Sequence, residues 1–238
     1  MGSRPPETEC EFDAVVIGAG FGGLYMLHRL RSLGLTVRVY EAGGGVGGTW
    51  YWNRYPGARC DVESMQYSYS FSEELEQEWE WSEKYSPQPE ILKYANHVAD
   101  KFNLHDNIYL STRVERAVFD ENKNRWFIHT DRGDRVSSQF CVMAVGCLSA
   151  ANIPQFEKLE GFNGDIYHTG EWPHGGVDFT GKNVGVIGTG SSAIQSIPII
   201  AQQAKSLKVF QRTPNYACLL YTSPSPRDVE ESRMPSSA

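Results

Sequence analysis

The feature of this sequence that most constrains its fold is a glycine-rich turn that occurs twice, each time between an apolar run and a helical pattern. The first copy is Gly-x-Gly-x-x-Gly at residues 18–23, directly after the apolar, β-branched run 12–17. Residues 24–33 follow with the apolar spacing of a helix, and a second apolar run, 35–40, ends on Glu41. The order strand, tight turn, helix, strand, acid predicts a βαβ unit that binds a dinucleotide.

Each residue of this unit has a physical task in holding a dinucleotide. Gly18 permits the sharp turn after the strand, Gly20 lets the backbone approach a pyrophosphate, and Gly23 lets the helix pack close to the strand. The amino end of the helix then faces the phosphates. Glu41 can accept a hydrogen bond from a ribose hydroxyl and would repel a 2′-phosphate, so this first site suits FAD or NAD rather than NADP.

The second copy repeats the unit further along the chain. An apolar run at 183–187 precedes Gly-Thr-Gly-Ser-Ser-Ala at 188–193, and a helical pattern and a further strand follow. Gln211 stands at the distance from the first glycine that Glu41 holds in the first unit, and Arg212 and Thr213 come next. A cation and a hydroxyl in place of the acid can hold a 2′-phosphate, so the second site points to NADPH.

Between the two units the sequence predicts helices and a small antiparallel meander. Residues 73–102 have the pattern helix, break, helix, with the break at 86–89, and three strand-like segments between 114 and 145 are separated by polar turns. The fold class is therefore α/β, with two Rossmann-type domains, a meander inserted in the first domain, and a truncated second domain. We expect an FAD-binding domain at 1–150, a linker at 151–182, the start of an NADPH-binding domain at 183–217, and a tail at 218–238.

The tail differs in composition from the rest of the chain. Residues 218–238 contain three Pro and five Ser without periodicity. The string Leu-Leu-Tyr-Thr-Ser-Pro-Ser-Pro-Arg-Asp within it resembles a translated sequencing adapter, and such segments are excluded from fold reasoning. We expect this tail to be non-native and the chain to be the N-terminal fragment of a longer protein.

The composition and charge of the chain argue against several classes of binding partner. The formal net charge is −7, and an acidic protein without a basic cluster is a poor partner for nucleic acid or an anionic membrane. No apolar run approaches the roughly 20 residues of a membrane helix, and the first residues do not have the pattern of a secretory signal. The five cysteines have neither metal-ligand nor disulfide spacing. We expect a cytoplasmic protein with no metal and no contact with nucleic acid or membrane; the oligomeric state is left open.

Two nucleotide sites, one for FAD and one for NADPH, imply a flavoprotein that takes hydride from a nicotinamide. Disulfide reductases share this layout but need a redox cysteine pair near the flavin, and the region after Glu41 offers only Cys60. A monooxygenase needs no protein nucleophile, because reduced flavin and O₂ supply the oxidant. The residues therefore favour an oxygen-activating enzyme.

Two further segments resemble type I Baeyer–Villiger monooxygenases, in particular the phenylacetone and cyclohexanone monooxygenase branch. One is the segment 47–61, Gly-Gly-Thr-Trp-Tyr-Trp-Asn-Arg-Tyr-Pro-Gly-Ala-Arg-Cys-Asp, which looks like the flavin-contacting segment of that family. The other lies between the glycine motifs and matches the family's fingerprint, at Phe162, Gly164, His168, Trp172 and Pro173.

The resemblance implies roles for individual residues. FAD should contact Gly18, Gly20, Gly23, Glu41, Thr49, Trp50, Asp61, Tyr67 and Val114. NADPH should contact Arg59, Gly188, Thr189, Gly190, Ser191, Ser192, Arg212 and Thr213. His168 should orient the linker rather than do chemistry. The implied reaction uses O₂ to turn a small-molecule ketone into an ester or lactone through a C4a-peroxyflavin.

The resemblance also implies a catalytic arginine, which Asp61 would position. No residue up to 217 matches the motif of that arginine, so we expect the fragment itself to be inactive. Two alternatives stay open: an N- or S-oxygenating flavin-containing monooxygenase, and a truncated nucleotide-binding module without catalysis.

Overall fold

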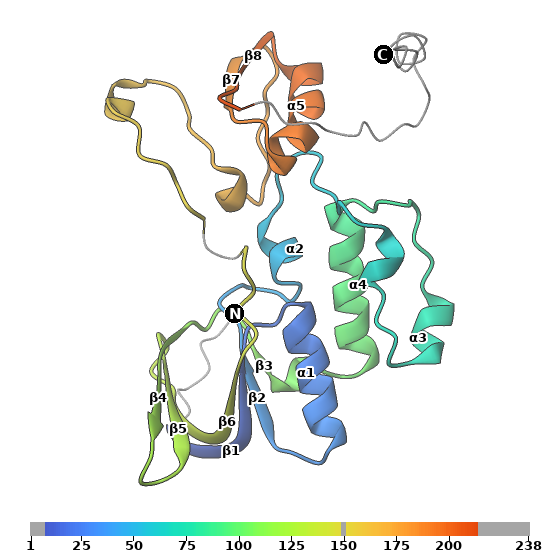
Figure 1. The fold of residues 1–238 in the computed structure, drawn as a ribbon, viewed down its shortest axis with the longest axis vertical. Helices are drawn as coiled ribbons and strands as arrows, with labels where there is room; N and C mark the ends of the chain where they lie inside the picture. The colour runs from blue at the N-terminus through green and yellow to red at the C-terminus, as the bar shows by residue number, and fades with distance from the viewer. Residues whose placement is uncertain (1–7, 149–150, 214–238) are drawn as a thin grey trace, which may run out of the picture.

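The computed structural model describes residues 8–148 and 151–213 and has two parts (Figure 1). A six-stranded sheet with its helices lies at one end, and a smaller unit of two strands and one helix lies at the other. The predicted non-native tail, 218–238, lies outside the described residues. The fold class predicted from the sequence is confirmed: both parts are built from βαβ units.

The first part begins with the predicted βαβ unit. Strand β1 (Thr8–Ile17) runs parallel to β2 (Val37–Tyr40), and α1 (Phe21–Ser32) connects them. Helix α1 starts directly after the turn at Gly20, three residues before the apolar periodicity begins, because the glycines of its first turn carry no side chains to reveal it.

The meander and the parallel strands form one continuous sheet of order β3-β2-β1-β6-β5-β4. Its other strands are β3 (Ile108–Tyr109), β4 (Val114–Asp120), β5 (Arg125–Thr130) and β6 (Arg135–Met143). Strand β6 pairs antiparallel with β5 on one side and parallel with β1 on the other, so the third strand of the meander is also a strand of the parallel sheet.

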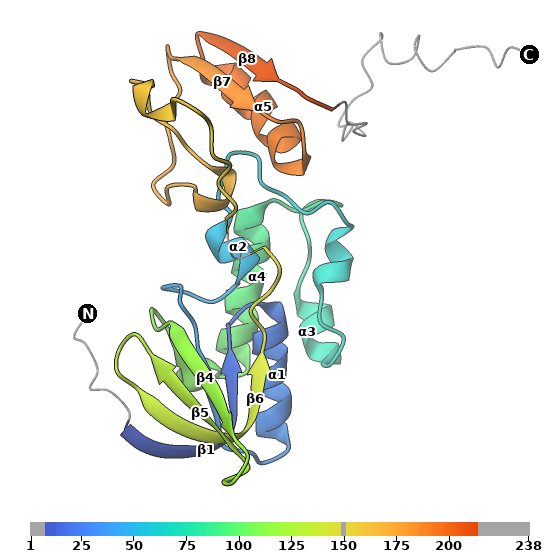
Figure 2. The ribbon, with the colours of Figure 1, turned by 60° about the vertical axis from the view of Figure 1, so that its left-hand side comes forward.

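Both faces of β1 are buried, each against a different layer. Ala14 and Val16 pack with α1 and α4 residues such as Leu27 and Ala95. Val15 belongs to a second cluster with Ile128 of the meander, which curls over the other face of the sheet (Figure 2). This double burial explains why β1 reads as a continuous apolar run instead of an alternating one.

The helical region lies beside the sheet and contains α2 (Thr49–Trp52), α3 (Glu73–Glu78) and α4 (Gln88–Lys101). The predicted break at 86–89 is two residues too long, because α4 already starts at Gln88. Proline is tolerated in the first helical turn, where its missing N–H has no intrahelical partner, so Pro89 does not end the helix. Short 3₁₀ turns are Ser64–Tyr67, His105–Asn107, Leu159–Gly161 and Thr169–Glu171.

The second part consists of β7 (Asn183–Ile187), α5 (Ser191–Gln203) and β8 (Ser206–Phe210), with β7 and β8 parallel. Val184 and Val186 pack on one face of this small sheet in a cluster with Ile200 of α5. In the ranges 8–148 and 151–213 we find no helix with both the length and the apolar character needed to cross a membrane.

Candidate functional site

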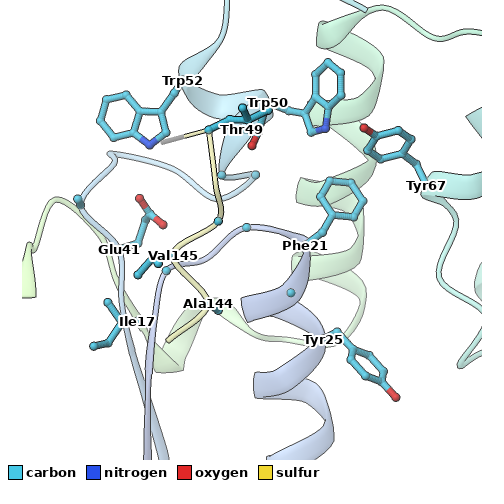
Figure 3. A pocket seen from close by; sticks show the side chains of 18 of the residues that line it. Ile17, Phe21, Tyr25, Glu41, Thr49, Trp50, Trp52, Tyr67, Ala144 and Val145 are labelled. Atoms are coloured by element: carbon cyan, nitrogen blue, oxygen red, sulfur yellow. The ribbon is translucent and has the colours of Figure 1, made fainter. Parts of the chain in front are cut away.

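A cavity of about 1320 Å³ lies at the carboxyl ends of the parallel strands. It opens where β1, β2 and β6 end, with Gly18, Glu41 and Ala144 in its wall. Ligands of open α/β sheets bind at this kind of edge. The predicted FAD contacts that line the cavity are Gly18, Gly20, Glu41, Thr49, Trp50, Tyr67 and Val114; Figure 3 shows several of them around the glycine turn.

The glycine turn has the geometry that the sequence predicts. Gly18 has φ +102°, a conformation that disfavours side chains. A Cβ at Gly23 would lie 1.9 Å from the carbonyl oxygen of Gly18, so the helix approaches the turn as closely as only glycine allows. Gly23 itself does not line the cavity; the structure gives it a packing role.

Glu41 is buried and held by two main-chain amides. The amide of Ala19 donates to one carboxylate oxygen over 2.7 Å, and the amide of Gly43 donates to the other over 2.6 Å. The side chain is 5% exposed and borders the cavity. Each carboxylate oxygen has two lone pairs, so the group can still accept hydrogen bonds from the hydroxyls of a bound ribose.

On the opposite side of the glycine turn the cavity has an aromatic wall (Figure 3). The rings of Trp50 and Tyr67 meet edge to face at 5.4 Å, and those of Tyr67 and Phe21 at 5.5 Å. Burial, and then the nearby Cys60 and Asp61, raise the pKa of Tyr67. A flat heteroaromatic ring system can pack against such a wall.

Residues of the linker, 151–182, also line the cavity, and this contact was not predicted from the sequence. His174 lines it, and its ring centroid lies 5.2 Å from that of Tyr51. Burial and the positive charge of Arg54 lower the pKa of His174. Trp52 was missed as well; its place inside the aromatic 47–61 segment is the signal by which it could have been found.

Asp61 and Arg59 lie outside the cavity wall. Asp61 is exposed. The Arg59 guanidinium pairs with Glu83 at 3.2 Å, and its main chain contacts α5 through Gln195. The structure therefore places the predicted arginine-positioning acid beside the nucleotide cavity rather than in its wall.

The second glycine turn copies the first. Gly188 has φ +104°, and its amide donates to Phe210 over 2.8 Å, just as Gly18 donates to Tyr40 over 2.8 Å. Helix α5 begins at Ser191 behind this turn, as α1 begins behind the first. The remaining predicted NADPH contacts are Thr189, Gly190 and Ser192 at the turn, and Arg212 and Thr213, both exposed, after β8.

The fingerprint residues take structural positions. His168 Nδ1 accepts a hydrogen bond from the amide of Gly170 over 3.2 Å and caps a 3₁₀ turn. Trp172 is 7% exposed and packs with Phe179 and Ile200, whereas Phe162 is 59% exposed. A Cβ at Gly164 would lie 2.7 Å from the ring of Phe162. Of the fingerprint residues, Trp172 therefore fastens the linker to the second unit, and the contacts of His168 and Gly164 stay within the linker.

Comparison with known proteins identifies the family. The model of the pyridine nucleotide-disulphide oxidoreductase family matches residues 15–219, and the chain belongs to that family. A Baeyer-Villiger monooxygenase of Pseudooceanicola batsensis is 48% identical over 90% of this chain and 39% of its own length. The phenazine N-monooxygenase PhzNO1 of Lysobacter antibioticus is 48% identical over 86% of this chain and 38% of its own length.

Solved structures agree with these relatives. An oxidized steroid monooxygenase bound to NADP is 67% identical, with a TM-score of 0.83 over 87% of this chain and 39% of that chain. The OTEMO complex with FAD and NADP is 47% identical, with a TM-score of 0.81 over 86% of this chain and 39% of that chain. The resemblance to Baeyer–Villiger monooxygenases is confirmed, and the chain spans about two fifths of the length of these relatives.

Proposed function

We propose that this chain supplies the two nucleotide sites of an FAD- and NADPH-dependent monooxygenase that converts ketones to esters or lactones. The observation that carries the proposal is the pair of glycine turns with matching backbone and different residues beyond the second strand. A buried acid, Glu41, ends the first unit, whereas Gln211, Arg212 and Thr213 end the second. The first site then holds a ribose without a 2′-phosphate, and the second holds one with it.

The residues around the cavity fit FAD. Its pyrophosphate would lie over Gly20 and the amino end of α1, because amides there are directed outward. The ribose would bind Glu41, and the ring system would pack near Trp50 and Tyr67. The N–H groups that open α5, together with Arg212, would hold the phosphates of NADPH.

Bound FAD supplies the acceptor for the hydride of NADPH and the means to activate O₂. The overall reaction converts ketone, O₂, NADPH and a proton into ester, water and NADP⁺. The chain's own contribution is to bind and orient: the aromatic wall excludes water from one side of the cavity, and the linker bearing Trp172 and His174 connects the two sites.

We further propose that this chain alone binds nucleotides but does not oxygenate ketones. No residue up to 217 matches the arginine motif that the resemblance implies, and Asp61 is the acid assigned to position that arginine. The exposure of Asp61 supports an acid available to a partner group from elsewhere.

N-oxygenation is the second candidate, favoured by the phenazine N-monooxygenase among the relatives. The two reactions differ in the substrate atom that is attacked: a carbonyl carbon needs a nucleophilic oxidant, and an amine nitrogen needs an electrophilic one. The nucleotide sites would be the same in both.

A two-stage experiment tests the proposal. First, the purified chain is mixed with FAD and separately with NADP⁺, and binding is followed by flavin fluorescence and calorimetry; binding of both is expected, and binding of neither would overturn the proposal. Second, the source DNA is read across the codon for residue 217, and the protein that it encodes is supplied with NADPH and a panel of ketones, amines and sulfides. Ester formation supports ketone oxygenation as the function. Formation of N-oxides alone would replace that proposal with N-oxygenation.

A further inference from the structure

The two nucleotide-binding units contact each other through the side chain of Gln195, on α5. Its Oε1 accepts hydrogen bonds from the hydroxyl of Tyr55 over 2.9 Å and from the main-chain amide of Arg59 over 3.2 Å. Its Nε2 donates to the carbonyl of Arg59 over 3.1 Å. One side-chain amide therefore forms hydrogen bonds with both the main-chain N–H and the main-chain carbonyl of Arg59, which lies 136 positions away in the sequence.

The backbone of the loop 55–59, with which Gln195 forms its hydrogen bonds, lies directly against α5. Gly57 has φ +77°, and a Cβ there would lie 2.3 Å from the main-chain oxygen of Gln195 and 3.2 Å from Ile199. The loop backbone and α5 are thus in direct contact, with no room for a side chain between them. Tyr55 also packs its ring into the small core that contains Trp172 and Ile200.

This contact lies within the first turns of the helix that begins at the second glycine motif. Gln195 is one turn beyond Ser191, where α5 starts. The loop 55–59 leads on to Asp61, and it follows α2, which contributes residues to the cavity wall. Three hydrogen bonds and the close approach at Gly57 therefore join α5 to the loop beside the cavity, in addition to the packing of Tyr55.

We propose that Gln195 is a positioning residue for nicotinamide-nucleotide binding: it holds the amino end of α5 in register with the 55–59 loop, so that a dinucleotide bound at the second glycine turn is directed toward the flavin cavity. Gln195 acts through Arg59 and α5. The inference rests on the assignment of the second turn to NADP in the proposed function.

The variants follow from the geometry. Gln195→Leu keeps the size of the side chain and removes all three hydrogen bonds; Tyr55→Phe removes one of them and keeps the ring in its core. Gly57→Ala pushes the loop from α5 without altering any of the bonding groups. The matched control is Gln202→Leu, the same substitution at an exposed position of the same helix.

We expect Gln195→Leu and Gly57→Ala each to weaken NADP⁺ binding about tenfold, because each loosens the contact between α5 and the 55–59 loop, while FAD binding stays at the wild-type value. Tyr55→Phe should weaken NADP⁺ binding about threefold. The loss in the double variant Tyr55→Phe/Gln195→Leu should be smaller than the sum of the two single losses, because the two residues share one bond. Gln202→Leu should bind both nucleotides as the wild type does.

A second readout does not depend on any nucleotide. The Arg59 amide donates to Gln195, so its hydrogen exchange, measured by NMR, should accelerate in Gln195→Leu and not in Gln202→Leu. If the wild type binds FAD but no NADP⁺, the assignment of the second turn to NADP fails. The exchange measurement still decides whether Gln195 holds the main chain of Arg59. Wild-type NADP⁺ affinity in Gln195→Leu, or unchanged Arg59 exchange, would overturn the inference; equal losses of FAD and NADP⁺ binding would show general destabilisation instead.

Discussion

The carboxylate of Glu41 accepts a hydrogen bond of 2.7 Å from the main-chain amide of Ala19, and this bond ties the end of β2 to the turn that follows β1. Gly43 donates to the second carboxylate oxygen. The acid that is expected to bind a ribose therefore also stabilises the turn that is expected to bind the pyrophosphate. We therefore expect ligand binding and local stability to depend on the same side chain.

Glu41→Gln should reduce both. A glutamine has the same shape, but its NH₂ group must face one of the two amide donors, and a buried donor without an acceptor costs about 1–3 kcal/mol. We expect a lower melting temperature and weaker FAD binding, measured by thermal unfolding and flavin titration. Glu115→Gln, at an exposed position of β4, is the control. Unchanged stability in Glu41→Gln would contradict the double role.

The two neighbouring glycines of α1 make a matched pair. Gly23→Ala places a methyl group 1.9 Å from the oxygen of Gly18, and backbone atoms cannot yield as a side chain end would. We expect a loss of about 3 kcal/mol in the free energy of unfolding, measured by urea denaturation. Gly22→Ala meets no atom within 4 Å and should gain about 0.5–1 kcal/mol, because alanine favours a helix. Equal effects of the two changes would contradict this packing.

His28 makes stability depend on pH. Its ring lies between Phe71 and Phe102, with centroids 4.4 Å and 4.7 Å away. Burial, then Arg31 and Arg29, lower the pKa of His28 from the ordinary 6.5. The unfolded chain therefore binds the proton first as pH falls below about 6.5, and the folded state loses stability between that value and the lower folded pKa.

The check is urea unfolding of the wild type and His28→Gln at about pH 8 and about pH 5. The variant should lose less stability between the two conditions than the wild type. His105→Gln, at an exposed position where the ring lies 2.9 Å from Asp100, should not reduce that loss. An identical loss in the wild type and His28→Gln would show that other groups carry the whole effect.

The sequence predicted those parts of the molecule that depend on local pattern. Each glycine turn lies with its helix inside a single βαβ unit, and the acid at the end of β2 belongs to the first of these units, so spacing alone determines the geometry. The limits of β7 agree with the predicted 183–187. The contacts of Glu41 with Ala19 and Gly43 follow from the same unit.

What the sequence did not reveal depends on contacts between distant segments. Tyr55 and Gln195 are 140 positions apart, and no periodicity relates them. The return of His174 to the cavity requires the linker to double back, and no local pattern predicts that path. The family resemblance singled out the segment 47–61, but only tertiary packing decides which of its side chains line the cavity.

Trp172 should fasten the linker to the second unit by packing alone. It is 7% exposed in a core with Phe179 and Ile200, and truncating a buried tryptophan costs about 3–5 kcal/mol. We expect Trp172→Ala to expose the linker, so that limited proteolysis cuts within residues 151–182 much faster than in the wild type, while the sheet of the first part keeps its protection. Phe162→Ala, in the same linker but 59% exposed, should leave the cleavage rate nearly unchanged. The interpretation fails if the two variants are cut at the same rate, because both would then loosen the linker without regard to burial. Cleavage throughout the first part in Trp172→Ala would contradict it in another way, since, within residues 8–148, Tyr55 alone belongs to the core around Trp172.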